Sequence, residues 1–172
     1  MKKNYCKLFS GLMLWTLVLF GERAHAQVSS YAFNQQSGTY TPITGGTLFG
    51  TTTSDDQRFV DPATPAGGTV LTGVGIPIGF NFTYNGIVFD RLAINNNGWI
   101  SLGQSTLTPS VDITSTSSYT ALSSTATNNP TLLRNRIAGL ARDLQAQAGA
   151  ELRVETIGTA PNRICVIQWT NY

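Results

Sequence analysis

Apolar and polar residues alternate along the segment 76–84 of this chain. The apolar side chains occupy every second position: Ile76, Ile78, Phe80, Phe82 and Tyr84. Because successive side chains of a β-strand point to opposite faces, this period of two predicts a strand with one face turned to a core. We therefore expect the chain to build a sheet with a buried side.

Turn-forming residues separate this segment from further strand patterns. Asn85-Gly86 lies between two such patterns, and this pair is the strongest short-range signal for a β-hairpin. The stretch 159–162 joins a strand predicted over 151–157 to one over 163–169, again as a hairpin. Many short strands punctuated in this way predict an all-β fold, an antiparallel β-sandwich of jelly-roll-like type.

The last two predicted strands differ in how their apolar residues are distributed. In the first, Leu152, Val154 and Thr156 alternate with charged residues, which predicts a half-exposed strand. In the second, residues 164–169 are apolar on both faces. We therefore expect the second strand to lie centrally, between two layers.

The first 26 residues have the features of a secretory signal peptide. Three lysines precede a mostly apolar run over 8–20, and Ala24-His25-Ala26 forms a small-x-small cleavage signature. We place cleavage after Ala26, which leaves a secreted module over 27–172 with no membrane span. The alternative is an uncleaved N-terminal anchor, but the apolar run is shorter than the roughly 20 residues that a bilayer-spanning helix needs.

Removal of the signal peptide changes the charge and takes away the histidine. The whole chain has a formal net charge of +2, whereas residues 27–172 hold seven arginines and eight acidic residues, a net charge of −1. We therefore expect no basic surface that attracts nucleic acid or an anionic membrane. The loss of His25 excludes Ser-His-Asp and Cys-His catalysis and the commonest zinc ligand from 27–172.

The remaining candidates for catalysis are weak. Cys165 is the only cysteine in 27–172, so no disulfide forms within that stretch, and its apolar neighbours favour a small buried side chain over a reactive thiol. Glu151 and Glu155 could act as paired acids, but both fall on the outward face of an alternating strand. We therefore expect neither an enzyme nor a bound cofactor.

Asp55 and Asp56, together with Asp61, are the best candidates for binding a metal ion. They lie in a polar stretch, and calcium prefers several carboxylate and carbonyl oxygens from a loop. The spacing does not match the EF-hand loop, so the alternative is a polar loop without an ion.

A run of three asparagines, 95–97, precedes Gly98 and Trp99. The pair Asn97-Gly98 tolerates positive φ at both central positions of a turn, which favours a hairpin. The alternative is a sugar site, in which the amide of Asn96 meets hydroxyl groups and the indole of Trp99 stacks on the sugar ring. The hairpin is the better supported of the two.

Two regions depart from the strand pattern. Residues 105–131 are rich in serine and threonine, which predicts a long surface connection with a short helical turn near 119–122. In 132–144, the apolar positions fit helical spacing, but Gly139 in the middle weakens a helix. Residue patterns alone leave this second region open.

Several motifs are carried together by this chain. They are the segments 31–43, 76–82, 96–103, 136–140 and 158–163, followed by Gln168-Trp169. In this combination the chain resembles an N-terminal module of large secreted proteins from Bacteroidetes-type bacteria. Its latter half is also similar to nidogen-like extracellular β modules.

The resemblance implies a β-sandwich, often followed by fibronectin- or immunoglobulin-like repeats and a C-terminal signal for type IX secretion. It implies further strands after Gln168-Trp169, so we expect the chain to be a fragment whose sandwich is incomplete at the C-terminus. It also implies a strand over 137–140 and a turn from 142–144. Related chains often carry a tryptophan and an Asp-Asp pair near 141–143, whereas this chain has Ala141-Arg142-Asp143, which weakens an acidic feature there.

Two functions are compatible with these features. The first is a non-catalytic module of a secreted or surface-anchored bacterial protein, with an adhesive, scaffolding or glycan-binding role. Its partners would be glycans or other surface proteins. The second is an accessory domain of a secreted hydrolase whose catalytic domain lies beyond Tyr172.

Overall fold

A computed structural model describes residues 32, 34–50, 55–114, 135–140 and 142–172. The chain divides into two units, Met1–Gly38 and Thr39–Tyr172, and only the second is largely described. The second unit carries all the described strands. The predicted signal peptide and the predicted helical turn near 119–122 lie outside the described residues.

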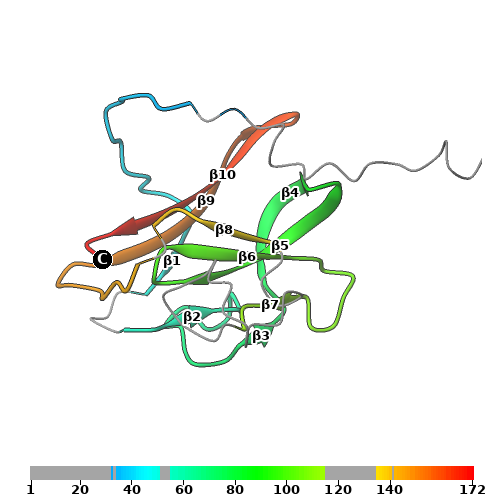
Figure 1. Cartoon of the computed structure of the whole chain (residues 1–172), viewed down its shortest axis with the longest axis horizontal. Coiled ribbons are helices and arrows are strands. Elements are labelled where there is room, and N and C mark those ends of the chain that lie inside the picture. Colours follow the sequence, from blue (N-terminus) through cyan, green and yellow to red (C-terminus); the bar gives the residue numbers. More distant parts are fainter. Residues whose placement is uncertain (1–31, 33, 51–54, 115–134, 141) are drawn as a thin grey trace, which may run out of the picture. The chain divides into compact units, whose positions relative to one another are not determined.

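The described part of the chain is all-β and contains ten strands and no helix (Figure 1). The strands are β1 (Thr47–Phe49), β2 (Arg58–Phe59), β3 (Thr72–Gly73), β4 (Ile76–Tyr84), β5 (Ile87–Asn95), β6 (Trp99–Gly103), β7 (Val111–Asp112), β8 (Arg136–Ala138), β9 (Glu151–Thr159) and β10 (Asn162–Thr170).

The strands form three antiparallel sheets. One has the order β1-β9-β10, and a second has the order β2-β5-β6-β8 with β4 also paired to β5. A third, small sheet pairs β3 with β7. Apolar side chains of the first two sheets share one core, in which Phe49 and Leu152 lie among residues of β4, β5 and β6. This packing of two sheets confirms the predicted β-sandwich class.

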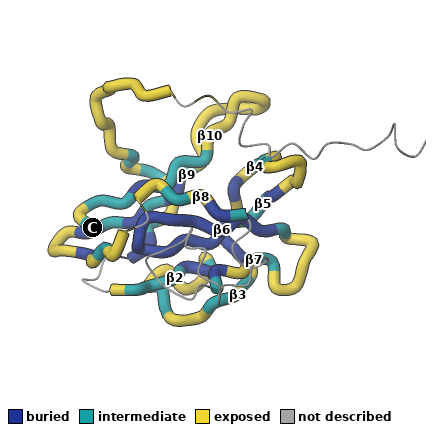
Figure 2. The backbone as a smooth tube through the Cα atoms, viewed as in Figure 1, coloured by how far each residue is buried: buried dark blue, intermediate teal, exposed yellow. Residues whose placement is uncertain are grey.

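The alternation that predicted β4 is present in the structure. Ile76 and Ile78 are buried, Phe80, Phe82 and Tyr84 are half-buried, and the residues between them are exposed. Figure 2 shows the longest buried stretches along β5 and β6, which form the centre of the second sheet.

Both predicted hairpins are confirmed. Tyr84 pairs with Ile87 across Asn85 and Gly86, whose φ values are 51° and 75°. Such a turn requires positive φ at both central residues, which the Asn-Gly pair adopts at little cost. Thr159 pairs with Asn162 at the turn between β9 and β10.

The prediction of a central position for the strand 163–169 is wrong. Within the described residues, β10 pairs only with β9 and forms the edge of its sheet. Ile164 is 60% exposed, and Cys165 to Ile167 are half-buried. Apolar residues on both faces of a strand do not show whether another strand lies beside it, because strand neighbours depend on the order of the sheet.

The helical spacing of apolar residues in 132–144 does not correspond to a helix in the described part of that region. The described part of that region contains β8, which pairs with β6, as the family resemblance implies. Ile137 and Leu140 are 38% and 58% exposed, so they do not form one buried helical face. The predicted connection over 105–131 is interrupted by β7, because Val111 and Ile113 bury their side chains in a second apolar cluster with Trp99.

Candidate functional site

The asparagine run forms the connection between β5 and β6. Asn95 pairs with Trp99, which leaves a three-residue loop over 96–98. The Gly98 amide donates a hydrogen bond to the Asn95 carbonyl at 3.2 Å, and Gly98 has a φ of 81°. The hairpin is confirmed, but positive φ occurs at Gly98 and not at Asn97. A three-residue hairpin loop needs the left-handed conformation only at its last position.

The side chain of Asn97 connects three segments that are far apart in sequence. Its Nδ2 donates to Asp56 Oδ1 at 2.9 Å, and its Oδ1 accepts from the Leu144 amide at 2.7 Å. Asn97 is fully buried, so these bonds are formed away from bulk water. A buried amide group that lost such partners would carry a desolvation cost, so Asn97 fixes the positions of both neighbours.

The backbone of the same loop supports further segments. The Asn96 amide donates to the Gln57 carbonyl at 3.1 Å, and the Gly98 carbonyl accepts from the amides of Gly139 and Leu140. The Trp169 indole Nε1 donates to the Asn95 carbonyl at 3.3 Å, which links β10 to the end of β5. The asparagine loop is therefore a junction between the two large sheets.

Trp99 lies at the base of this junction and is fully buried. The Arg136 guanidinium carbon is 4.7 Å from the centroid of the indole ring, and Arg136 Nη2 donates to the Thr114 carbonyl. Burial lowers the pKa of Arg136, and nearby Asp112 partly opposes that shift. The guanidinium thus covers one face of the ring with a cation–π contact.

This geometry bears on the sugar site predicted from Asn96 and Trp99. Asn96 is 1% exposed and Trp99 is 0% exposed. A sugar ring can stack only on an indole face that solvent reaches. The two residues are brought together, as expected for neighbours in one loop, but their surroundings favour a role in packing.

The predicted calcium ligands are partly brought together. One carboxylate oxygen each of Asp55, Asp56 and Asp143 lies within 4.8 Å of the others. Asp61 belongs to a separate turn, in which its Oδ1 accepts from the Ala63 amide at 2.8 Å. Asp143 was missed by the residue-based reasoning, although the family resemblance placed an acidic pair near 141–143.

The acidic cluster, defined as Asp55, Asp56 and Asp143, has the donor atoms that calcium prefers. Its side chains come from two segments that the Asn97 amide holds in place through Asp56 and Leu144. None of the three carboxylates forms an ion pair with a described basic residue. Three like charges at this separation repel one another, and a divalent cation would relieve that repulsion.

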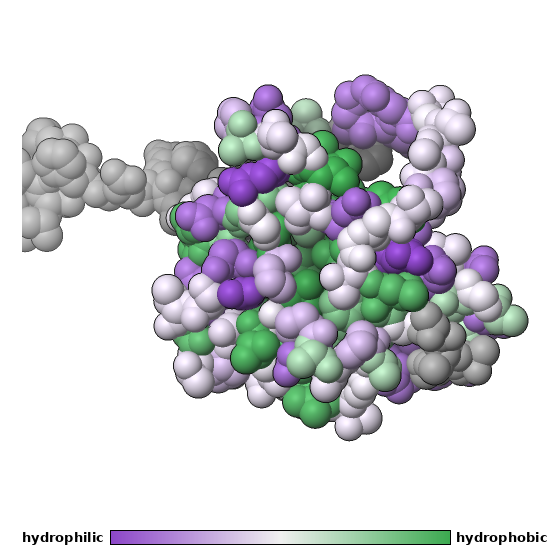
Figure 3. Space-filling view, turned by 180° about the vertical axis from the view of Figure 1, so that it is seen from behind, coloured by the Kyte–Doolittle hydropathy of each residue, from purple (hydrophilic) through white to green (hydrophobic). Residues whose placement is uncertain are grey.

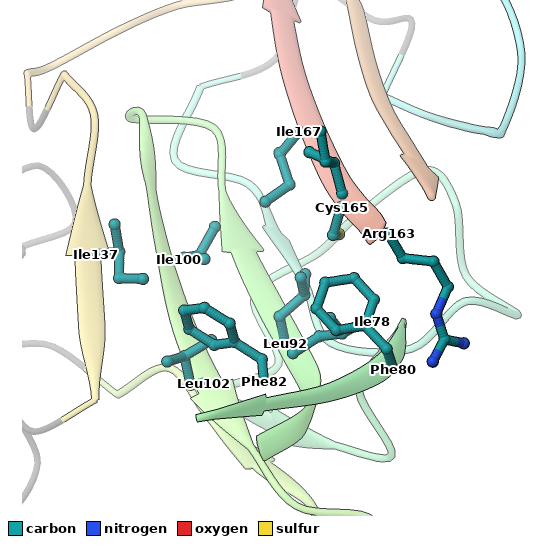
Figure 4. Close-up of a pocket in the computed structure, with 11 residues that line it drawn as sticks. Ile78, Phe80, Phe82, Leu92, Ile100, Leu102, Ile137, Arg163, Cys165 and Ile167 are labelled. Atoms are coloured by element: carbon teal, nitrogen blue, oxygen red, sulfur yellow. The ribbon is translucent and has the colours of Figure 1, made fainter. Parts of the chain in front are cut away.

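A second feature is an apolar groove of about 450 Å³ between the two large sheets (Figure 4). The second sheet contributes side chains from four strands: Ile78, Phe80, Phe82, Leu92, Ile100, Leu102 and Ile137. The first sheet contributes four neighbouring residues of β10: Arg163, Ile164, Cys165 and Ile167. Its volume and lining fall within the range of pockets that bind apolar groups.

The residues weighed for catalysis do not form a reactive arrangement. Burial raises the pKa of the Cys165 thiol, and a hydrogen bond with Thr156 opposes this only in part, so the thiolate is disfavoured at neutral pH. Glu151 forms an ion pair with Arg153 at 2.8 Å, which lowers the pKa of Glu151. A carboxylate held ionised by a neighbouring guanidinium is a poor general acid.

A family model described as NIDO related matches residues 30–172. No curated protein and no solved structure matches the chain.

Proposed function

This chain belongs to the NIDO-related family, and we propose that it is a non-catalytic extracellular module that binds other surface proteins in an adhesive or scaffolding role. The family is one of non-catalytic extracellular modules, and this supports a binding role without catalysis. A β-sandwich is a common scaffold for such binding modules.

The choice of a protein partner rests on a contrast between two candidate sites, the asparagine loop with Trp99 and the apolar groove. The amides and the indole suited to a sugar are buried and engaged in the junction. The groove beside β10 instead presents apolar side chains. Apolar surface that is open to solvent favours a protein partner over a glycan. Glycan binding is therefore the weaker alternative.

The character of the surface agrees with this choice. On the face shown in Figure 3, hydrophobic and hydrophilic residues form small interspersed patches. Residues 27–172 have a net charge of −1, so a field that would attract nucleic acid is not expected. Anchoring by a few apolar contacts fits such a surface better than electrostatic capture.

Extracellular localisation rests on the family and on the predicted signal peptide over 1–26. Among the residues that the structure describes, no helix has the length and apolarity needed to cross a membrane. Export by the type IX route and attachment to the cell surface are parts of the proposal that come from the sequence resemblance alone.

The alternative is an accessory domain beside the catalytic domain of a secreted hydrolase. One experiment separates the two roles. The full chain is presented to an array of glycans and to a panel of purified bacterial surface proteins, and each bound ligand is then checked for cleavage. We expect saturable binding to a protein and no cleavage. Selective binding to a polysaccharide would favour the accessory role, and turnover by the chain itself would contradict both.

Calcium binding at the acidic cluster is a second candidate function. It is favoured by the meeting of three carboxylates from two distant segments beside the junction. A calcium ion there would hold the segment around Asp143 against the one around Asp56 and so stabilise the junction. Comparison of the thermal stability of Asp143→Asn and Asp61→Asn variants tests this role.

A further inference from the structure

The pair Asn-Gly occurs twice in this chain, and the two copies have opposite surroundings. Asn85-Gly86 forms the two-residue turn between β4 and β5, and both of its residues are exposed (Figure 2). Asn97-Gly98 belongs to the loop between β5 and β6, and both of its residues are buried. The molecule therefore contains its own comparison for the chemistry that this dipeptide undergoes.

That chemistry is the loss of the side-chain amide. The backbone nitrogen of the glycine attacks Cγ of the asparagine, and a C–N bond forms. The side-chain amino group leaves as ammonia with the proton that the backbone nitrogen gives up. Water, the only co-reactant, then opens the resulting cyclic imide at either carbonyl, which yields aspartate or isoaspartate without oxidation or reduction. Glycine favours the attack, because it has no Cβ atom to hinder its own amide nitrogen.

The turn at Asn85-Gly86 leaves its reacting groups open to solvent. A Cβ atom placed on Gly86 would meet no heavy atom within 4 Å. In a two-residue turn the ladder hydrogen bonds belong to the flanking residues, here Tyr84 and Ile87, so they do not engage the Gly86 nitrogen. The attack requires Asn85 to rotate out of the closed turn, in which its φ is 51°. The tip of an exposed hairpin is among the segments that open at the least cost.

The second pair is held at each of its reacting groups. Asn97 Nδ2 donates to Asp56 Oδ1 at 2.9 Å, and Asn97 Oδ1 accepts from the Leu144 amide at 2.7 Å. The Gly98 nitrogen, which would be the nucleophile, donates to the Asn95 carbonyl at 3.2 Å. The attack would break these bonds at a buried site, so it requires the junction between the two large sheets to open.

We propose that Asn85 is a site of spontaneous deamidation and isoaspartate formation, and that the fold protects the same dipeptide at Asn97. Aspartate before glycine also suits a two-residue turn, so this product keeps the hairpin and adds a negative charge to its tip. Isoaspartate routes the backbone through its side chain and lengthens the turn, which disrupts the pairing of Tyr84 with Ile87. The site lies between two paired strands of this chain, and it is independent of the proposed binding role.

The test follows the reaction in the folded chain. The full chain is incubated at mildly alkaline pH in water labelled with heavy oxygen, which enters the product when the imide opens. Digestion after arginine places Asn85 and Asn97 in separate peptides, because Arg91 lies between them. Mass spectrometry with electron-transfer fragmentation then locates the label and separates isoaspartate from aspartate. Asn81, exposed on β4 and followed by phenylalanine, is the control in the same peptide as Asn85.

We expect both labelled products at Asn85, formed at least about a hundredfold faster than at Asn97 in the folded chain, because the buried pair reacts only when the junction opens. In urea the two pairs should react at similar rates. Asp56→Ala removes a partner of Asn97 and should speed the reaction there while leaving Asn85 unchanged. Near-ultraviolet circular dichroism checks that this variant remains folded.

Three results would overturn the inference. Equal rates at Asn85 and Asn97 in the folded chain would show that the fold protects neither pair selectively. Label at both pairs in urea but at neither in the folded chain would show that the closed turn prevents the attack at Asn85. A rate at Asn85 no faster than at Asn81 would show that Gly86 does not promote the reaction.

Discussion

The guanidinium of Arg136 packs on the indole of Trp99, with 4.7 Å between the guanidinium carbon and the ring centroid. Arg136 is 5% exposed and Trp99 is 0% exposed, so the pair joins β8 to the first residue of β6 inside the module. A cation in such a place must be compensated by the ring and by hydrogen bonds such as that to the Thr114 carbonyl.

This pair predicts that stability depends on the planar guanidinium group of Arg136 and not only on its positive charge. We expect Arg136→Met to lower the free energy of unfolding by about 2–3 kcal/mol, because it removes the cation–π contact and leaves the half-buried Thr114 carbonyl without its donor. Arg136→Lys should recover only part of this loss, because an ammonium cannot stack as a planar group. Urea denaturation measures both variants. An Arg136→Lys protein as stable as the parent would contradict the stacking argument.

Asn97 provides a second prediction. We expect Asn97→Ala to lower the free energy of unfolding by about 1–3 kcal/mol, because it leaves the half-buried partners Asp56 and Leu144 without their hydrogen bonds to the buried amide. The matched control is Asn81→Ala, which removes an amide from an exposed position of β4 and should change stability little. Chemical denaturation of both variants gives the comparison, and equal small effects would show that the junction does not depend on Asn97.

The backbone of the loop provides a third prediction. Gly98 has a φ of 81°, a conformation that costs a residue with a Cβ atom about 1–2 kcal/mol. Gly98→Ala should therefore destabilise the module by that amount. Gly139→Ala is the control, because a Cβ there would meet only the Gly98 carbonyl oxygen at 3.7 Å. Melting temperatures of the two variants should differ clearly, and a Gly98→Ala protein that melts with the control would overturn the prediction.

The pair Asp90 and Ser105 predicts a dependence of stability on pH. The Ser105 hydroxyl donates to Asp90 Oδ2 at 2.5 Å and its amide donates to Oδ1 at 2.7 Å, and the hydroxyl bond is the main cause of the lowered pKa of Asp90. Because the pKa is lower in the folded than in the unfolded state, this stabilisation is present above the unfolded value and is lost as the pH falls through the folded value.

The corresponding variant is Ser105→Ala. We expect it to raise the pKa of Asp90 toward its ordinary value and to flatten the loss of stability in acid. Carboxyl carbon chemical shifts across a pH titration report the pKa, and urea midpoints report stability. Since the Asp90 side chain is partly exposed to solvent, screening keeps the stability effect small. An unchanged Asp90 titration in the variant would refute the assignment.

Calcium addition tests the acidic cluster. If calcium binds with the submillimolar to millimolar affinity of extracellular modules, about 5 mM Ca²⁺ should raise the melting temperature by about 3–5 °C. Asp143→Asn should abolish this shift, whereas Asp61→Asn should retain it, because Asp61 lies in a separate turn. Chelation should reverse the shift in the parent protein. Equal behaviour of the two variants would remove the cluster as the calcium site.

The hairpins and the alternating strands were predictable because their causes are local. The conformations of Asn85 and Gly86 follow from the residues themselves, and the burial of Ile76 and Ile78 follows from their spacing along β4. The prediction failed for β10, where a run apolar on both faces lies at an edge. The spacing of apolar residues shows how they are distributed between the two faces of a strand, but it does not show which strands lie beside it.

The candidate sites depended on contacts that no local pattern contains. The sequence by itself determined the β class, the hairpin turns, the charge and the absence of histidine after residue 26. Only the tertiary structure decided that Asn97 would join Asp56 and Leu144, which are 41 and 47 residues away, and that Asp143 rather than Asp61 would complete the acidic cluster. These placements are set by the order in which the strands pair, because that order brings distant segments to the same edge of the sandwich.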